Sequence, residues 1–175
     1  NAPIPLRMGE INKLSEAISA PVIGAEVTSM DDLNNLFDKA VEHFGGKIDF
    51  ILHSVGMSVN IRKGNHYTHL NHEFEMKTLD ISAVSFHKVL QVAYEKDALN
   101  EWASVVALTY IAAQRVFPDY NEMADAKSLL ESIARSFGYH YGIKNKVRVN
   151  TISQSPTRTT AGSGVKGFDG FINFS

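Results

Sequence analysis

Tyr120 and Lys127, seven positions apart, are the residues in this sequence whose types and spacing best suit acid chemistry. On one helix, seven residues are two turns, so both side chains would lie on one face, with the lysine about 10 Å further along the axis. A nearby ammonium favours the ionised or strongly hydrogen-bonding form of a phenol, whose ordinary pKa is about 10. The pair predicts a proton donor held beside a cation, although this spacing also occurs by chance on solvated helices.

Alternating apolar patterns predict the elements that must position this pair. Four strands are expected, at residues 22–27, 48–56, 104–110 and 147–152. Four helices are expected, at residues 5–19, 29–44, about 74–92 and 120–142, with Ser29 as a helix cap and a polar loop over residues 58–72. Strands alternating with helices predict a Rossmann-like, doubly wound parallel sheet with helices on both faces, a three-layer α/β/α fold.

In such sheets, ligands bind outside the carboxyl ends of the strands. Three segments follow predicted strands and should therefore meet at one edge: Ser54–Gly56, Thr109–Tyr110 and Ser153–Pro156. Tyr120 and Lys127 follow the second of them. The crevice at this edge is the predicted functional site.

The bulk composition predicts one globular domain over residues 1–175, because 44% of the residues are hydrophobic and 21% are charged. The net charge of -2 and the scattered basic residues favour neither a nucleic-acid nor a membrane-surface partner. The absence of cysteine excludes disulfides and thiolate nucleophiles, and fits the cytoplasm. No apolar run is long enough for a membrane span, and the N-terminus lacks a signal-peptide pattern.

Three histidines, His66, His69 and His72, recur at intervals of three in the predicted polar loop. No carboxylate pattern with ligand spacing accompanies them. The sequence therefore predicts solvated histidines and no metal site.

The stretch Leu108–Lys127 resembles the active-site segment of the NADH-dependent enoyl-acyl carrier protein reductases, a family within the short-chain dehydrogenase/reductases. Ordinary short-chain dehydrogenases separate the tyrosine and lysine by four positions. The resembled family separates them by seven and carries a second tyrosine ten positions upstream, here Tyr110. The resemblance implies reduction of the trans-2 double bond of an enoyl-acyl carrier protein, the last step of fatty acid elongation, with Tyr110, Tyr120 and Lys127 as catalytic residues.

The wider spacing has a physical reason. If Lys127 holds the nicotinamide ribose, a tyrosine set further back is displaced from the carbon that accepts hydride. Conjugate reduction places negative charge on a carbonyl oxygen two carbons away, where a set-back phenol can stabilise it. The geometry therefore favours alkene over ketone reduction.

Further stretches implied by the resemblance supply the cofactor and substrate contacts. The implied cofactor-binding residues are Glu26 and Val27 at the adenine, Ser54, Val55 and Gly56 along the adenosine and pyrophosphate, Lys127 at the ribose, and Pro156, Thr157 and Thr159 at the nicotinamide and phosphates. The implied substrate-binding residues are Ser58, Tyr110 and Tyr120. Gln154-Ser155-Pro156 departs from the family's usual Ala-Gly-Pro, which puts a bulkier backbone beside the cofactor.

The expected cofactor is NADH rather than NADPH. A 2′-phosphate is normally met by an arginine or lysine just after the second strand; residues 1–3 offer neither, and only Arg7 is near in sequence. The glycine-rich turn that cradles a pyrophosphate is not found before Asn1, and the family's final strand is not found either. We therefore expect a dinucleotide-binding domain that is incomplete at both ends and whose 175 residues alone bind dinucleotide poorly.

The resemblance also implies a homotetramer with the long helices at its interface. Two alternatives stay open at this point: a short-chain reductase acting on a ketone, which a screen of carbonyl substrates would reveal, and a non-catalytic relative that keeps the fold, which only an assay would separate.

Overall fold

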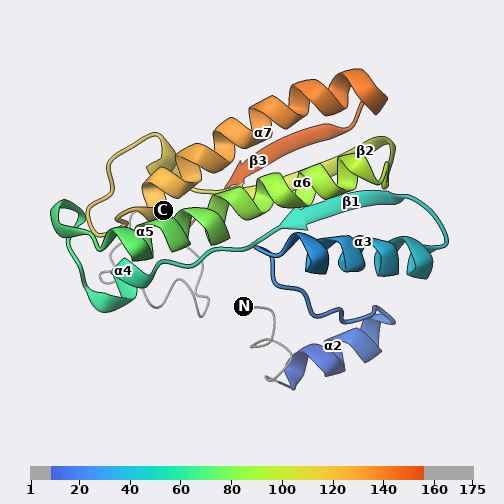
Figure 1. Cartoon of the computed structure of the whole chain (residues 1–175), viewed down its shortest axis with the longest axis horizontal. Coiled ribbons are helices and arrows are strands. Elements are labelled where there is room, and N and C mark those ends of the chain that lie inside the picture. Colours follow the sequence, from blue (N-terminus) through green and yellow to red (C-terminus); the bar gives the residue numbers. More distant parts are fainter. Residues whose placement is uncertain (1–8, 156–175) are drawn as a thin grey trace.

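A three-stranded parallel sheet forms the centre of the computed structural model, which describes residues 9–155 (Figure 1). The strands are β1 (Ile48–His53), β2 (Leu99–Thr109) and β3 (Arg148–Ser153), in the order β1-β2-β3. β2 pairs with both neighbours in parallel, with His53 opposite Ala107 and Ser153 opposite Thr109. All three carboxyl ends therefore lie at one edge of the sheet.

Helical segments precede and connect these strands. They are α2 (Glu10–Ile18), α3 (Met30–Phe44), α4 (Val59–Lys63), η1 (Tyr67–His69), α5 (His72–Leu79), the π-helical η2 (Asp80–Val84), α6 (Ser85–Glu95), η3 (Ile111–Ala113) and α7 (Met123–Asn145). No helix in the described part of the chain is long and apolar enough to cross a membrane.

Residues at both ends of α3 and on its buried face explain why this segment is helical. Ser29 caps the helix by accepting a hydrogen bond from the Asp32 amide, with 3.2 Å between Oγ and N. At the other end Gly45 adopts the left-handed conformation that closes helices, with a φ of 67°. Leu33 and Phe37, one turn apart, are buried. The predicted helix over residues 29–44 is confirmed.

One layer of helices covers one face of the sheet. Figure 1 shows α3, α6 and α7 side by side, with α6 in front of β2, and each helix contacts its neighbour in this layer. The core lies between this layer and the helix-facing side chains of the strands. Its fully buried members include Phe86, Leu90, Val105, Ala107 and Leu130. The predicted Rossmann-like parallel α/β class is confirmed.

The opposite face of the sheet is exposed within residues 9–155. Phe50, Leu52 and Ile152 point to that face and are each more than half exposed. The described residues therefore supply the sheet and one of the two predicted helical layers.

Two sequence predictions are wrong in detail. Residues 22–27 form no strand, because no strand in the described residues pairs with them; a bond from the Ser29 amide to the Glu26 carbonyl instead turns the chain. The last long helix begins at Met123 rather than Tyr120, because Asp119 and Asn121 take left-handed φ angles of 67° and 55°. The predicted polar loop over residues 58–72 also contains the short helices α4 and η1.

Leu33 offers a test of this packing. Leu33→Ala should lower the free energy of unfolding by about 2–5 kcal/mol, because it leaves a cavity under the helical layer. Leu14→Ala is the matched control: Leu14 is 62% exposed on α2, so its loss should change stability by less than about 0.5 kcal/mol. Denaturant unfolding of both variants measures the difference, and equal losses would contradict the placement of α3.

Candidate active site

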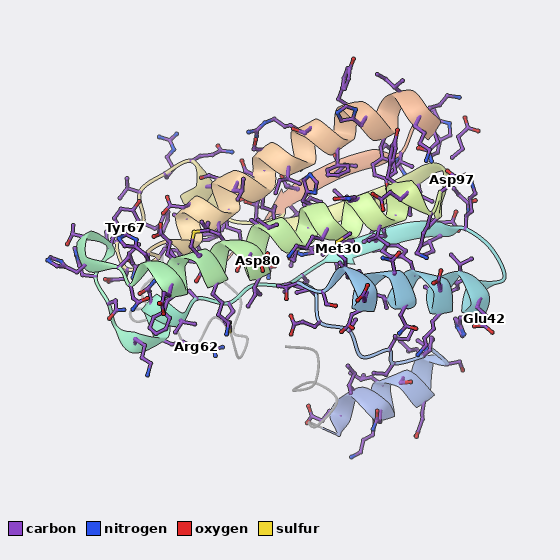
Figure 2. The ribbon with its side chains drawn as sticks, viewed as in Figure 1. Met30, Glu42, Arg62, Tyr67, Asp80 and Asp97 are labelled. Atoms are coloured by element: carbon purple, nitrogen blue, oxygen red, sulfur yellow. The ribbon has the colours of Figure 1, made fainter. Side chains whose placement is uncertain are left out.

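The carboxyl edge of the sheet gathers the segments that the sequence predicts to meet. Thr109 ends β2 opposite Ser153 at the end of β3, and the Gln154 amide donates to the Thr109 carbonyl at 3.3 Å. Ser54 directly follows β1. Figure 2 orients this edge: Asp97, before β2, lies at the amino end of the sheet, and Arg62 and Tyr67 lie at the opposite end. For the residues up to Ser155, the last one that the structure describes, the predicted juxtaposition is confirmed.

Two tyrosines lie against each other at this edge. The ring centroids of Tyr110 and Tyr120 are 4.9 Å apart, and the two rings make an interplanar angle of 47°. The ring centroid of Phe117 lies 5.3 Å from that of Tyr110. Tyr110 directly follows β2, and Tyr120 packs on the edge of the core. Burial, followed by the neighbouring Tyr110, raises the pKa of Tyr120 to about 12. The Tyr120 hydroxyl is therefore protonated at neutral pH and able to donate a hydrogen bond.

Lys127 reaches the same edge from the first turns of α7. Its side chain is buried, and Nζ donates to the Leu108 carbonyl at 2.8 Å. Burial lowers the pKa of Lys127 to about 8. We expected the ammonium to favour ionisation of Tyr120, but the structure gives the opposite: burial penalises the charged form of each group. Tyr120 also precedes α7, so the pair does not share a helix face; both residues converge on the end of β2.

His53, to which the sequence analysis gave no role, is buried close enough to Lys127 for its pKa to be affected by the lysine charge. His53 ends β1, and its Nε2 lies 2.9 Å from Ser85 Oγ, while Nδ1 has no hydrogen-bond partner among the described residues. Burial, and then the charge of Lys127, lowers the pKa of His53 to about 4. The imidazole is thus neutral at neutral pH, which avoids a second buried charge near Lys127.

The hydroxyl of Ser82 holds the loop after β1 through the backbone of Met57. Ser82 Oγ accepts from the Met57 amide at 3.0 Å and donates to the Met57 carbonyl at 3.3 Å. Ser82 lies in η2, and π-helical turns of this kind are frequent at functional sites. A Cβ at Gly56 would meet only ordinary contacts at 3.9 Å, so packing within this chain does not require the glycine. Ser54, in the same loop, is exposed and Val55 half-buried.

Ser58 is buried, and its hydroxyl is engaged inside the protein. Ser58 Oγ donates to Glu122 Oε1 at 2.7 Å and accepts from the Ile61 amide at 3.0 Å, which caps α4. Contact between Ser58 and substrate stays a prediction, made less favourable by these bonds. Glu122 was not singled out from the sequence.

Glu26 and Val27 lie near the carboxyl edge although they form no strand. Lys88 Nζ, on α6, binds the Thr28 carbonyl at 3.0 Å and Asp80 Oδ1 at 2.8 Å, which ties this segment to the beginning of α6. The Glu26 amide donates to Asp32 Oδ2 at 2.7 Å. Adenine binding by Glu26 and Val27 stays a prediction.

Pro156, Thr157 and Thr159 lie outside the described residues, so their predicted cofactor contacts stay predictions.

The three histidines His66, His69 and His72, which lie before and at the first residue of α5, make local contacts. His66 Nδ1 and His69 Nδ1 each lie 2.8 Å from Thr68 Oγ1, and His72 Nδ1 lies 2.7 Å from Glu75 Oε2. Within residues 9–155, no group of three or more histidine or acidic side chains is placed to hold a metal ion.

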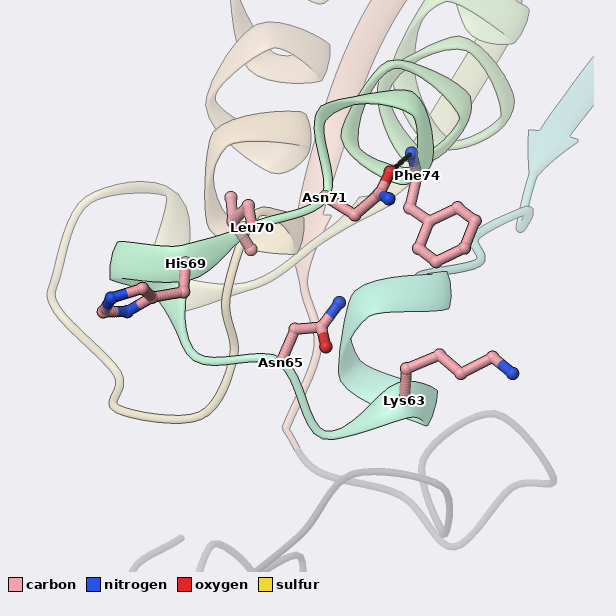
Figure 3. Close-up of a pocket in the computed structure, with 6 residues that line it drawn as sticks. All are labelled: Lys63, Asn65, His69, Leu70, Asn71 and Phe74. Carbon is pink, nitrogen blue, oxygen red and sulfur yellow. Dashed lines mark hydrogen bonds between the residues drawn. The ribbon is translucent and has the colours of Figure 1, made fainter.

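An open pocket of about 630 Å³ lies beside α4 and α5, apart from the two tyrosines (Figure 3). Its lining residues are Lys63, Asn65, His69, Leu70, Asn71 and Phe74. Asn71 Oδ1 accepts from the Phe74 amide at 3.1 Å and so caps α5. None of the predicted site residues lines this pocket.

The low pKa of His53 makes stability depend on pH. The folded-state pKa is lowered from 6.5 to about 4, so the stabilisation is complete above pH 6.5 and is lost as the pH falls through about 4. Over this interval the wild type should lose about 3 kcal/mol more unfolding free energy than His53→Asn. Denaturant unfolding across this pH range measures the loss, with exposed His66→Asn as the control that should behave like the wild type. The same pH dependence in His53→Asn and wild type would contradict the burial of a neutral imidazole.

Comparison with known proteins identifies the family. A family model described as Enoyl-(Acyl carrier protein) reductase matches residues 5–175. The enoyl-acyl-carrier-protein reductase (NADH) 1 of Rhizobium meliloti strain 1021 is 33% identical over 159 residues, which are 90% of this chain and 57% of that protein. The FabI of Rickettsia felis, also named as an NADH enzyme, is 31% identical over 160 residues, with 90% and 60% covered.

Solved structures agree with this assignment. The FabI–NADH complex from Alistipes finegoldii has a TM-score of 0.97 and 60% sequence identity, with 99% of this chain and 62% of that chain covered. The NADH enoyl-acyl-carrier-protein reductase of Aquifex aeolicus VF5 has a TM-score of 0.87 and 25% identity, with 97% and 65% covered. The chain spans about three fifths of the length of these relatives. Because the family model matches nearly the whole chain, the chain belongs to the enoyl-(acyl carrier protein) reductase family.

Proposed function

We propose that the protein containing this chain uses NADH to reduce the trans-2 double bond of an enoyl-acyl carrier protein. The observation that carries the proposal is the convergence at the carboxyl edge of the sheet: two tyrosine rings 4.9 Å apart, with Lys127 anchored on the Leu108 carbonyl. Family membership and the NADH-named relatives support the same reaction.

Tyr120 is proposed as the group that stabilises the oxygen of the thioester carbonyl. When bound, NADH supplies hydride to the β-carbon of the double bond. Negative charge develops on the carbonyl oxygen of the resulting enolate, and a donor aimed at that oxygen lowers the barrier. A proton taken up from water at the α-carbon then completes the reduction. Tyr120 suits this role because its raised pKa keeps the hydroxyl protonated. Tyr110 is proposed to pack at the acyl thioester, beside Tyr120.

Lys127 is proposed to hold the nicotinamide ribose. Its ammonium has three N–H donors, and the described residues accept only one of them, at Leu108. The remaining donors fit hydroxyl acceptors of a sugar. The loop of Ser54, Val55 and Gly56, held by Ser82, would lie along the rest of the dinucleotide, with Pro156, Thr157 and Thr159 as further proposed contacts.

The partners follow from the proposed reaction. The substrate would be carried on acyl carrier protein, and NADH is preferred to NADPH because the relatives from Rhizobium meliloti and Rickettsia felis are named for NADH. A cysteine-free chain supports a cytoplasmic location.

A homotetramer built on the long helices is also proposed. The 23-residue helix α7 exposes Leu129, Tyr139 and Ile143, at 37, 67 and 71% of their surface. Leu129, Ser136 and Ile143 recur every seven residues and so share one helix face. Leu129 and Ile143 are exposed apolar side chains on that face, and they favour a partner helix there.

Paired substitutions test the catalytic assignment. In the protein containing this chain, Tyr120→Phe should lower kcat for an enoyl thioester by about a hundredfold, because a transition-state donor is lost. Lys127→Met should instead raise the KM or Kd for NADH, because it removes the ribose contact. NADH oxidation and NADH titration measure the two effects. Wild-type kinetics in both variants would eliminate the assignment, and turnover of ketones in place of enoyl thioesters would point to a carbonyl reductase.

Ile143→Asp tests the assembly. A carboxylate placed in an apolar helix interface lacks a partner and should dissociate the tetramer. Light scattering coupled to size-exclusion chromatography should show a smaller mass for this variant and the tetramer mass for Phe44→Asp. Phe44 is a suitable control because it is 66% exposed on α3, away from α7. A wild-type protein that elutes as a monomer would refute the proposal.

A further inference from the structure

We infer that Glu122 is a positioning residue: one oxygen of its buried carboxylate ties the loop after β1 and helix α5 to the turn that carries Tyr120. This inference rests on the proposed function, in which Tyr120 donates to the substrate. Glu122 follows Tyr120 by two residues and lies directly before α7. Its side chain is completely buried.

A single oxygen of Glu122 gathers three donors from two other parts of the chain. Glu122 Oε1 accepts from Ser58 Oγ at 2.7 Å and from Asn60 Nδ2 at 3.3 Å. Thr78 Oγ1 also lies 2.9 Å from Glu122 Oε1 and shares its one proton with the Phe74 carbonyl, which is likewise 2.9 Å away. Ser58 and Asn60 belong to the loop after β1 and to α4, and Thr78 belongs to α5. The carboxylate is therefore the point where three segments meet.

A second set of bonds joins the same segments. Asn60 Oδ1 accepts from Asn65 Nδ2 at 2.7 Å and from the Asn71 amide at 3.1 Å. Asn121 Nδ2, next to Tyr120, donates to the Asn65 carbonyl at 2.6 Å. Both residues that follow Tyr120 are thus fixed by the segment between β1 and α5.

Tyr120 needs such support because no regular element holds it. It lies between two residues with left-handed φ angles, Asp119 and Asn121, and precedes the first residue of α7. Its backbone amide makes a turn bond of 3.2 Å to the Phe117 carbonyl. The placement of the phenol therefore depends on the side chains that anchor this turn, and a displacement of about 1 Å at a reacting group can cost about a hundredfold in rate.

The chemistry of the cluster indicates that stabilising the fold is not its main role. Glu122 Oε2 is buried and has no hydrogen-bond partner among the described residues. Burying a carboxylate with half of its acceptors unused is unfavourable, and well-packed apolar groups often replace buried charges without loss of stability. A carboxylate that accepts three bonds on one oxygen instead gives directional control over where the turn lies.

Two substitutions at Glu122 separate the acceptor from the charge. Glu122→Gln keeps an oxygen for the three donors, so kcat for an enoyl thioester should stay within about threefold of the wild type. Glu122→Met has similar volume but accepts no bond, so kcat should fall by about tenfold or more. The KM for NADH should change less than kcat in both variants, because Lys127 is unchanged and Ser82 still holds the loop of Ser54, Val55 and Gly56 through Met57. Steady-state kinetics on the protein containing this chain give this split.

Controls separate positioning from loss of fold. Glu42→Met and Glu42→Gln make the same changes on the exposed face of α3 and should leave kcat unchanged. Thr78→Val removes one donor with little change of shape, so it should lower kcat by a few fold even if Glu122→Met fails to fold. Wild-type kcat in Glu122→Met, or an equal fall in Glu122→Gln and Glu122→Met, would overturn the inference.

A spectroscopic measurement keeps the inference independent of the proposed reaction. A fluorotyrosine placed at Tyr120 should give a single fluorine resonance that is the same in the wild type and Glu122→Gln. The resonance should shift or broaden in Glu122→Met, or in Thr78→Val where that variant alone folds. An unchanged resonance in the folded variants would refute the positioning role. A wild-type protein that fails to reduce enoyl thioesters would refute the proposed function alone.

Discussion

Parallel hydrogen bonding of β2 to both β1 and β3 is the constraint on which the candidate site depends. Parallel strands bring their carboxyl ends to one edge, and here Thr109 lies opposite Ser153 while β1 ends opposite Ala107. The chain beyond β2 supplies Tyr110, and Lys127 returns to the same strand by donating to the Leu108 carbonyl. The residues proposed for catalysis thus lie at the carboxyl end of β2. The packing of α6 and α7 on β2 buries the helix-facing side chains of this strand and so holds it in place.

Desolvation has the largest effect on the pKa values of the titratable side chains buried at this edge. Tyr120, Lys127 and His53 are all shifted toward their neutral forms, with burial as the largest cause in each case. The neutral imidazole of His53 adds no positive charge beside that of Lys127, and a neutral phenol keeps its proton for donation. Lys127, with a pKa of about 8, stays mostly protonated at neutral pH, and an anionic dinucleotide would favour this form further, since a nearby negative charge favours the protonated lysine.

The sequence predicted the elements better than the local geometry between them. Regular alternation and caps located α3 and the three strands, because burial on one face of a helix or strand leaves a periodic pattern. The same reasoning failed at residues 22–27, whose β-branched residues suit a strand only where a neighbouring strand offers hydrogen bonds. It also failed at Tyr120, because left-handed φ angles at Asp119 and Asn121 leave no apolar pattern. The family resemblance supplied the residues proposed for catalysis there, but a helical spacing argument supplied the wrong geometry.

The sequence does contain a pattern that could have identified Glu122 as a buried polar residue, although not its partners. Glu122, Ala126, Leu130 and Ile133 follow the spacing of one helix stripe, and all four are buried. A carboxylate that continues an apolar stripe by one turn is out of place on a core-facing surface, which indicates a partner set inside the protein. The partners themselves could not be read from the sequence, because Ser58, Asn60 and Thr78 are 44 to 64 positions away and meet Glu122 only once the sheet has brought their segments together. Polar networks of this kind depend on tertiary structure, so spacing along the chain identifies at most the residue that anchors them.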